Sequence, residues 1–172
     1  MNNSETINLF LVDDDAMFLK SLEHVLFHRL KYNVKIKPFQ TGEAYLKSLD
    51  QQPDIVVLDY ILNTVSQKSL NGMNLLRQTM DRYPSTTVIM LSAQEKMEVA
   101  IDCIKHGAYD YVIKNDNAIL RLQALLRNAI SSIQLRKQMK GYNLWAKLIT
   151  AVIVLLLVTA IVIEMFFQRI LH

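Results

Sequence analysis

Residues able to bind a cation or to donate to an anion stand directly after four short apolar runs of the sequence. They are Asp13, Asp14 and Asp15 after the first run, Asp59 after the third, Ser92 after the fourth and Lys114 after the fifth. Clustered carboxylates repel one another unless a cation lies among them, and Mg²⁺ takes carboxylate oxygens together with phosphate oxygens. With a hydroxyl and an ammonium beside them, such carboxylates could bind a metal and stabilise a phosphoryl group during its transfer.

Taken one at a time, these residues have ordinary structural explanations. Asp15 and Ser92 could cap the helices that follow them, and a single lysine such as Lys114 is usually a solvated surface residue. Their joint occurrence after successive runs is what favours a shared site, because the carboxyl ends of parallel strands meet at one edge of a sheet.

The apolar runs alternate with stretches of helical periodicity. The runs span 7–12, 34–39, 55–58, 88–91 and 109–113, and the helical stretches span 16–30, 41–49, 71–83, 95–105 and 117–139. This alternation predicts an α/β fold, a doubly wound five-stranded parallel sheet with helices on both faces. The 34–39 run alternates apolar and polar residues and contains Pro38, which favours a place near the edge of the sheet.

Composition excludes some classes of protein. The chain has 19 basic and 16 acidic residues, and this near balance does not predict binding to nucleic acid. Its single cysteine, Cys103, cannot form an internal disulfide, so we expect the domain to work in a reducing compartment. The first residues, MNNSETIN, lack the basic start and apolar run of a signal peptide.

The segments around the candidate residues resemble the receiver domain of two-component response regulators. The matching segments are LFLVDDD (9–15), PDIVVLDY (53–60), Asn71-Gly72, VIMLSAQ (88–94) and GAYDYVIK (107–114), and the resemblance covers roughly residues 5–135. It implies a flavodoxin-like fold with strand order 2-1-3-4-5. It also implies that Asp59 accepts a phosphoryl group from a sensor histidine kinase or a phosphotransfer protein.

The resemblance implies further roles around Asp59. Asp13 and Asp14 would hold Mg²⁺ together with Asp59 and the backbone carbonyl of Ile61. Ser92 would be the switch hydroxyl that moves onto the phosphate, and Lys114 would pair with a phosphate oxygen. Tyr111 would be the aromatic switch that turns inward on activation, with simple packing of a strand tyrosine against a helix as the alternative.

The sequence departs from the family pattern beside the site. The loop between Asp59 and Gly72 is several residues longer than usual and lacks proline, so we expect it to be more mobile or to bind a partner. The family's Lys-Pro pair, usually joined by a cis bond, is Lys114-Asn115 here. A cis bond without proline costs about 2.5–4 kcal/mol, so this bond is expected to be trans or held under strain.

Two positions tune how fast water reaches an acyl phosphate in the family, and here they hold Ile61 and Gln94. An apolar Ile61 cannot orient a water molecule. The phosphorylated state is therefore expected to be fairly long-lived.

The C-terminal part carries sixteen consecutive residues without a charge, at 148–163. We interpret it as a transmembrane helix over 144–167 that follows a receiver domain over 1–137 and a basic juxtamembrane linker over 138–143, with a short tail at 168–172. Gly141 and Asn143 suggest a break before the span, and the basic flank places the receiver in the cytoplasm, on the inner (cytoplasmic) membrane. A core helix or a coiled-coil dimer helix is the alternative.

Three functions from different classes fit these features. The first is a membrane-anchored response regulator, not an enzyme beyond its own phosphorylation and dephosphorylation, that signals by phosphorylation-dependent protein contact and could form a homodimer. The second is a pseudo-receiver scaffold that is never phosphorylated. The third is a Mg²⁺-dependent phosphatase of the haloacid-dehalogenase type, suggested by Asp13-x-Asp15, although the later acidic pair and the cap domain of that class are missing.

Overall fold

The structure is a computed structural model that describes residues 6–62 and 71–170. The chain divides into two compact units, Met1–Ser132 and Ile133–His172. The first holds the sheet and the candidate residues. The longer connection over 61–71 lies mostly outside the described residues.

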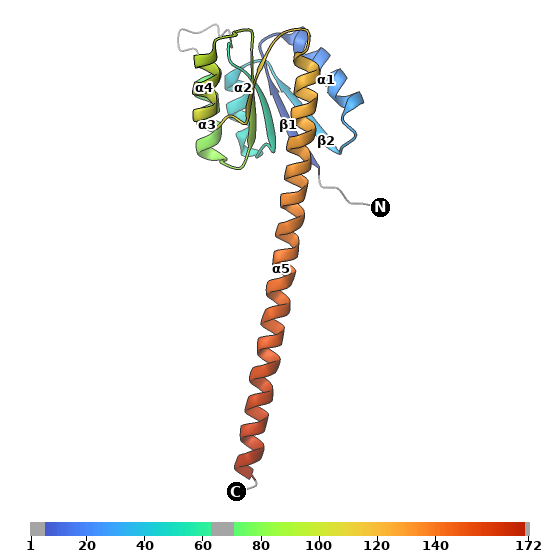
Figure 1. Ribbon diagram of the computed structural model, residues 1–172, viewed down its shortest axis with the longest axis vertical. Helices are drawn as coiled ribbons and strands as arrows, with labels where there is room; N and C mark the ends of the chain where they lie inside the picture. The colour runs from blue at the N-terminus through green and yellow to red at the C-terminus, as the bar shows by residue number, and fades with distance from the viewer. Residues whose placement is uncertain (1–5, 63–70, 171–172) are drawn as a thin grey trace. The chain divides into compact units, whose positions relative to one another are not determined.

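Five parallel strands form a single sheet in the first unit (Figure 1). They are β1 (Ile7–Val12), β2 (Val34–Phe39), β3 (Ile55–Asp59), β4 (Thr87–Ser92) and β5 (Asp110–Ile113). The order is β2-β1-β3-β4-β5 and every neighbouring pair is parallel. This confirms the predicted doubly wound, flavodoxin-like α/β fold and its strand order.

The position of each strand explains its residue pattern. All residues of β3 and β4 are buried, because central strands of a parallel sheet are covered on both faces. The edge strand β2 has only partly buried and exposed residues. Pro38 of β2 pairs in register with Leu11 of β1. Because β2 is an edge strand, the missing backbone N–H of Pro38 does not interrupt a central ladder of hydrogen bonds.

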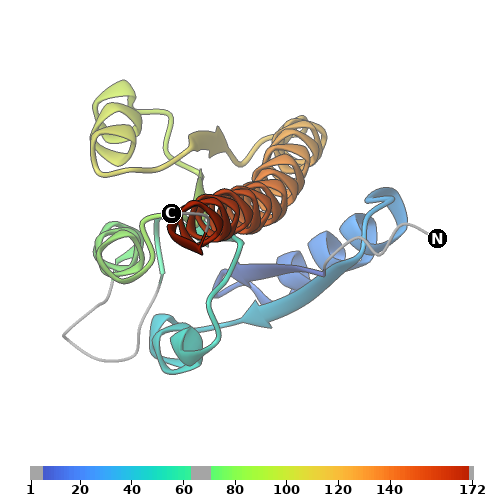
Figure 2. The same cartoon turned by 90° about the horizontal axis from the view of Figure 1, so that it is seen from below.

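Helices cover both faces of the sheet. They are α1 (Ala16–Arg29), α2 (Gly42–Lys47) with a 3-10 turn after it (Ser48–Asp50), α3 (Gly72–Arg82), α4 (Met97–Lys105) and α5 (Ala118–Ile170). Figure 2 shows α1 and the first turns of α5 on one face, with α2, α3 and α4 on the other. Side-chain caps begin three of them, from Asp15, Thr41 and Asn71.

The core beneath α2, α3 and α4 contains one buried polar pair. The Tyr45 hydroxyl lies 2.6 Å from Thr79 Oγ1, and Thr79 in turn donates to the carbonyl of Leu75. Burial raises the pKa of Tyr45 to about 12, with the hydrogen bond to Thr79 acting in the opposite direction. Because both hydroxyls are paired, this polar contact can lie inside an otherwise apolar layer.

The C-terminal helix corrects one expectation. Helix α5 runs without interruption from Ala118 to Ile170, so the break predicted at Gly141 and Asn143 is wrong. A single glycine inside a helix costs only about 1 kcal/mol relative to alanine, which good helix formers on either side outweigh. Within the described residues, none of the helices is both long enough and apolar enough to cross a membrane, and the transmembrane helix predicted over 144–167 is not supported.

Candidate functional site

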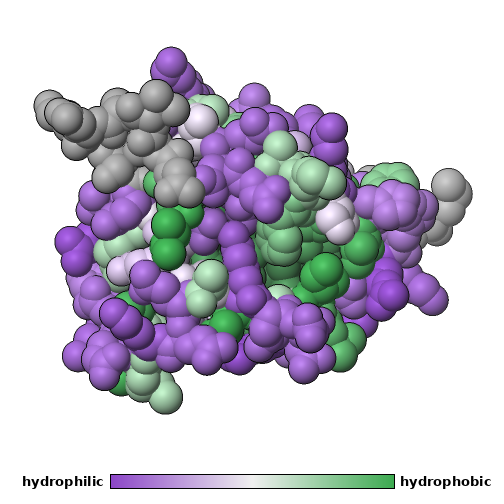
Figure 3. Space-filling model, turned by 90° about the horizontal axis from the view of Figure 1, so that it is seen from above, coloured by the Kyte–Doolittle hydropathy of each residue, from purple (hydrophilic) through white to green (hydrophobic). Residues whose placement is uncertain are grey.

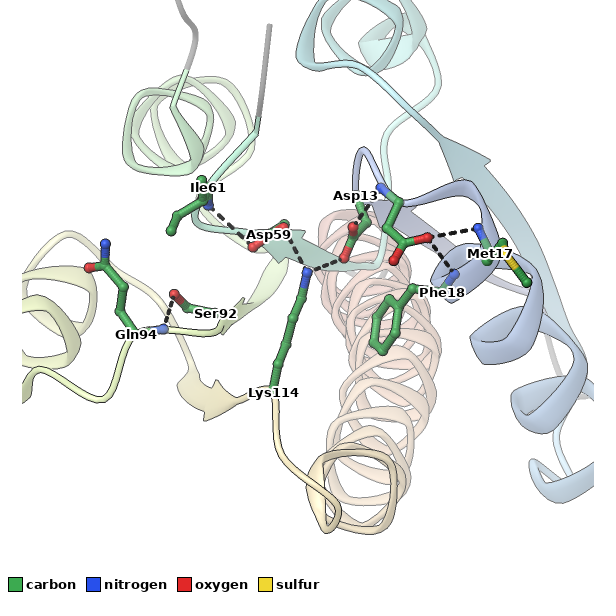
Figure 4. Close-up of polar contacts among 9 residues, drawn as sticks. Asp13, Met17, Phe18, Asp59, Ile61, Ser92, Gln94 and Lys114 are labelled. Atoms are coloured by element: carbon green, nitrogen blue, oxygen red, sulfur yellow. Dashed lines mark hydrogen bonds and ion pairs between the residues drawn. The ribbon is translucent and has the colours of Figure 1, made fainter.

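The carboxyl ends of four strands bring the candidate residues together (Figure 4). Asp13 directly follows β1, Asp59 is the last residue of β3, and Ser92 is the last residue of β4. Lys114 follows β5, and its backbone N–H donates to the carbonyl of Ser92 at 2.7 Å. Figure 3 views this end of the domain, where hydrophilic side chains surround smaller groups of hydrophobic ones.

Three carboxylates form the centre of the site. One oxygen from each of Asp13, Asp14 and Asp59 lies within 4.8 Å of the others. Asp13 is 2% exposed and Asp59 is 4% exposed. Asp13 Oδ1 accepts from the backbone N–H of Asp15 at 3.0 Å, and Asp59 Oδ1 accepts from that of Ile61 at 3.2 Å. These backbone bonds fix both carboxylates at the strand ends.

Lys114 connects two of these carboxylates. Its Nζ lies 2.7 Å from Asp13 Oδ2 and 2.7 Å from Asp59 Oδ2. The bond between Lys114 and Asn115 is trans. With asparagine in place of the family's proline, the ammonium still lies at Asp59, where the sequence predicts it.

The two proposed switch residues both form hydrogen bonds with the backbone of Gln94. The side chain of Ser92 is fully buried, and its Oγ accepts from the backbone N–H of Gln94 at 3.1 Å. The Tyr111 hydroxyl donates to the Gln94 carbonyl at 2.9 Å. Tyr111 is buried in the core as well, where its ring packs against apolar side chains. Its role as an aromatic switch stays a prediction.

Comparisons with known proteins agree with this geometry. A family model described as "Response regulator receiver domain" matches residues 9–126, more than half of the chain. The chain belongs to the response regulator receiver family. The sequence is 33% identical over 119 residues to the chemotaxis protein CheY of Listeria monocytogenes, an alignment that covers 69% of this chain and 96% of that protein.

Other relatives carry a receiver within a longer protein or show the same fold. The DNA-binding transcriptional regulator NtrC of Proteus hauseri is 27% identical over 76% of this chain, which corresponds to 26% of NtrC. Among solved structures, the BeF3-activated DrrB receiver domain superposes with a TM-score of 0.63 and 28% identity, over 74% of this chain and 99% of that one. The receiver of a LuxO repressor from Vibrio parahaemolyticus, at 19% identity and a TM-score of 0.68, covers 78% of this chain and 98% of that one and shows the fold alone.

Burial dominates the electrostatics of the receiver site. Desolvation raises the pKa of the Asp59 carboxyl, the Lys114 ammonium partly offsets this rise, and the nearby Asp13 adds to it. Burial acts to lower the pKa of Lys114, but its bonds to Asp13 and Asp59 outweigh burial and raise it. The site therefore favours a charged lysine and destabilises an isolated charge on Asp59.

The donor set fits Mg²⁺, which receiver domains typically bind at this acidic pocket. Three carboxylates face one ammonium, so a divalent cation would compensate the remaining negative charge. The buried Oδ2 of Asp13 has the ion pair with Lys114, yet among the described residues it accepts no hydrogen bond of good geometry. The backbone N–H of Ile61 donates to Asp59, and Ile61 is 40% exposed. The ligand role of its carbonyl stays a prediction.

Two residues of the site had no role in the sequence prediction. A Cβ built on Gly72 would lie 2.2 Å from the Asp59 carbonyl oxygen and 2.7 Å from Tyr60 Cα, so only glycine lets α3 approach Asp59 this closely. The ring of Phe18 lies 5.0 Å from Lys114 Nζ. The Asn-Gly pair was part of the family resemblance, but Phe18 belongs to an ordinary amphipathic pattern and no sequence signal marks it.

Proposed function

We propose that this receiver accepts a phosphoryl group on Asp59 from the phosphohistidine of a sensor kinase or a phosphotransfer protein. Phosphorylation then changes the binding of another protein. The observation that carries the proposal is the position of Lys114, which lies 2.7 Å from both Asp13 and Asp59 inside a cluster of three carboxylates.

In this transfer, a carboxylate oxygen of Asp59 forms a bond to phosphorus. The bond from phosphorus to the donor's histidine nitrogen breaks, and its electron pair stays on that nitrogen, which then takes a proton. Lys114 stabilises the negative charge of the phosphoryl oxygens as they approach. Mg²⁺ held by Asp13, Asp14 and Asp59 would neutralise charge on the same oxygens when bound. No other substrate is turned over.

The switch acts through the end of β4. The Ser92 hydroxyl would donate to a phosphoryl oxygen while its Oγ still accepts from the backbone N–H of Gln94, so a movement of Ser92 would carry Gln94 with it. The Gln94 carbonyl holds the hydroxyl of Tyr111, so a shift of this segment changes the setting of the aromatic ring. We expect the protein partner to read this change.

Incubation of the full-length chain with Mg²⁺ and acetyl phosphate tests the phosphorylation. We expect one phosphoryl group per chain by intact mass, and none on the Asp59→Asn variant. Asp15→Asn is the matched control, because Asp15 belongs to the same acidic run but caps α1 at the backbone N–H groups of Met17 and Phe18. Equal labelling of wild type and Asp59→Asn would contradict the proposal by placing the phosphoryl group on another residue. No labelling of either would contradict it and favour a scaffold without phosphorylation.

We also propose that the C-terminal segment attaches the receiver to a membrane. Support comes from the sixteen uncharged residues at 148–163 and from the exposure of their large apolar side chains, such as Ile149, Leu155 and Ile161. Basic residues are frequent just before the segment, which favours a cytoplasmic receiver. Membrane location would then set which partners the phosphorylated receiver meets.

Fractionation of cells tests the attachment. The full chain should remain in the membrane pellet after a carbonate wash, and a chain truncated after Asn143 should move to the supernatant. A full chain that is released by carbonate, or a truncated chain that stays in the pellet, would overturn this part of the proposal.

A further inference from the structure

The ammonium of Lys114 contacts three groups, and two of these groups are carboxylates. Asp13 and Asp59 each lie 2.7 Å from Nζ. The aromatic ring of Phe18 lies on a further side, with its centroid 5.0 Å from Nζ (Figure 4). A lysine ammonium within about 6 Å of a ring centroid is attracted by the negative face of the ring.

The backbone of Phe18 is fixed where α1 begins. Asp15 Oδ1 accepts from the backbone N–H of Phe18 at 3.0 Å and from that of Met17 at 2.9 Å. The next residue, Leu19, is buried in the core and sets the rotation of the helix. These contacts hold the ring, which is half-buried, beside the lysine.

A lysine side chain is a compact charge on a flexible four-carbon stem, so its position needs outside constraint. The backbone N–H of Lys114 is bound to Ser92, and this bond constrains only the start of the side chain. On a phosphorylated Asp59, the ammonium must leave one carboxylate contact and still remain at the site. Of the contacts described for Nζ, the one to the Phe18 ring does not involve a carboxylate.

We propose that Phe18 is a positioning residue for Lys114, which holds the ammonium at the phosphoacceptor through a cation–π contact, an inference that rests on the proposed phosphorylation of Asp59. The ring limits the excursions of the lysine into water before the phosphoryl group arrives. Small displacements of a charged group that stabilises a transition state reduce rates strongly. Loss of the ring therefore slows phosphorylation without removing any group that touches the phosphate.

Three full-length variants test the contact. Phe18→Leu keeps an apolar side chain but removes the π face, Phe18→Tyr keeps the face, and Phe27→Leu is the control on the same helix, because Phe27 is 72% exposed and away from the site. The rate of phosphorylation by acetyl phosphate with Mg²⁺ should fall about threefold to tenfold in Phe18→Leu. It should stay within about twofold of wild type in the other two. Urea unfolding of each variant shows whether the fold is retained.

A double-mutant cycle with Lys114→Met separates positioning from packing. The readout is the affinity for beryllium fluoride with Mg²⁺, measured by calorimetry. Phe18→Leu should weaken this affinity beside Lys114 and have no further effect beside Met. An equal loss in both backgrounds, or no loss in either, would overturn the inference while leaving the proposed function intact. A wild-type chain that is not phosphorylated would overturn the proposed function, and the positioning role with it.

Discussion

Apolar side chains have opposite surroundings in the two units of the chain. Every residue of β3 and β4 is buried by helices of the same domain, whereas Leu148, Leu156 and Ile163 of the second unit are exposed. Hydropathy is high in both regions. The comparison shows that hydropathy identifies apolar side chains that need to be shielded from water. Only the fold shows whether other parts of the same chain shield them.

The largest expected difference between the two regions is in the response to truncation of a leucine. Leu58→Ala, at a side chain with no exposure, should lower the free energy of unfolding of the receiver by about 2–5 kcal/mol. Leu156→Ala, at a side chain that is 62% exposed, should change it by less than about 0.5 kcal/mol. Urea denaturation followed by circular dichroism measures both. Equal losses would show that the second unit is packed like the first.

The buried thiol of Cys103 sharpens the comparison through pH. Burial raises its pKa to about 11, above the ordinary thiol value of about 9. Between these values the thiol of the unfolded chain ionises and that of the folded chain does not. Folding stability should therefore fall as pH rises from about 9 to about 11, by roughly 2–3 kcal/mol. Unfolding of wild type and Cys103→Ala across this range measures the difference, which should vanish in the variant.

A reporter thiol extends this test to the second unit. In the Cys103→Ala background, Leu156→Cys should react rapidly with a water-soluble maleimide in the free chain, whereas Cys103 of the wild type should react slowly until urea is added. If the reporter is instead as slow as Cys103, the second unit is covered even without lipid.

The two glycines at 72 and 141 provide a third contrast. Gly72→Ala should destabilise the receiver by about 1–3 kcal/mol, because the new methyl group would meet the backbone of Asp59 and Tyr60. It should also slow phosphorylation of Asp59. Gly141→Ala, inside α5, should be neutral or raise helix stability by up to about 1 kcal/mol. Thermal unfolding of both variants, with the acetyl phosphate assay, measures these effects, and a harmless Gly72→Ala would contradict the tight approach.

The smallest expected effect is a gain of stability at the site itself. Burial raises the pKa of Asp59, which means that the folded state destabilises the charged form of this carboxyl. Asp59→Asn should therefore raise the free energy of unfolding at neutral pH, by on the order of 1 kcal/mol. The gain should shrink as pH falls toward the ordinary pKa of an aspartate. Asp50→Asn, at an exposed ion pair with Arg82, is the control and should leave stability unchanged.

Sequence alone predicted the strands to within a residue or so, because β3 and β4 are short continuous apolar runs bounded by polar residues. It also predicted that Asp15 could cap the helix after it, since a single side chain determines such a cap. The break predicted at Gly141 was wrong, because a single helix-breaking residue does not end a helix that has long helical segments on either side. The contact between Phe18 and Lys114 was out of reach, because it depends on helix rotation and side-chain angles that leave no spacing pattern.

The hydrogen bond from the Lys114 backbone to the Ser92 carbonyl has a consequence for signalling. Ser92 is the last residue of β4 and Lys114 directly follows β5, so this bond joins the ends of the two neighbouring strands. If Ser92 is drawn toward a phosphate, the same pull advances the root of the lysine side chain. Under the proposed phosphorylation of Asp59, Ser92 and Lys114 would then move together rather than one after the other.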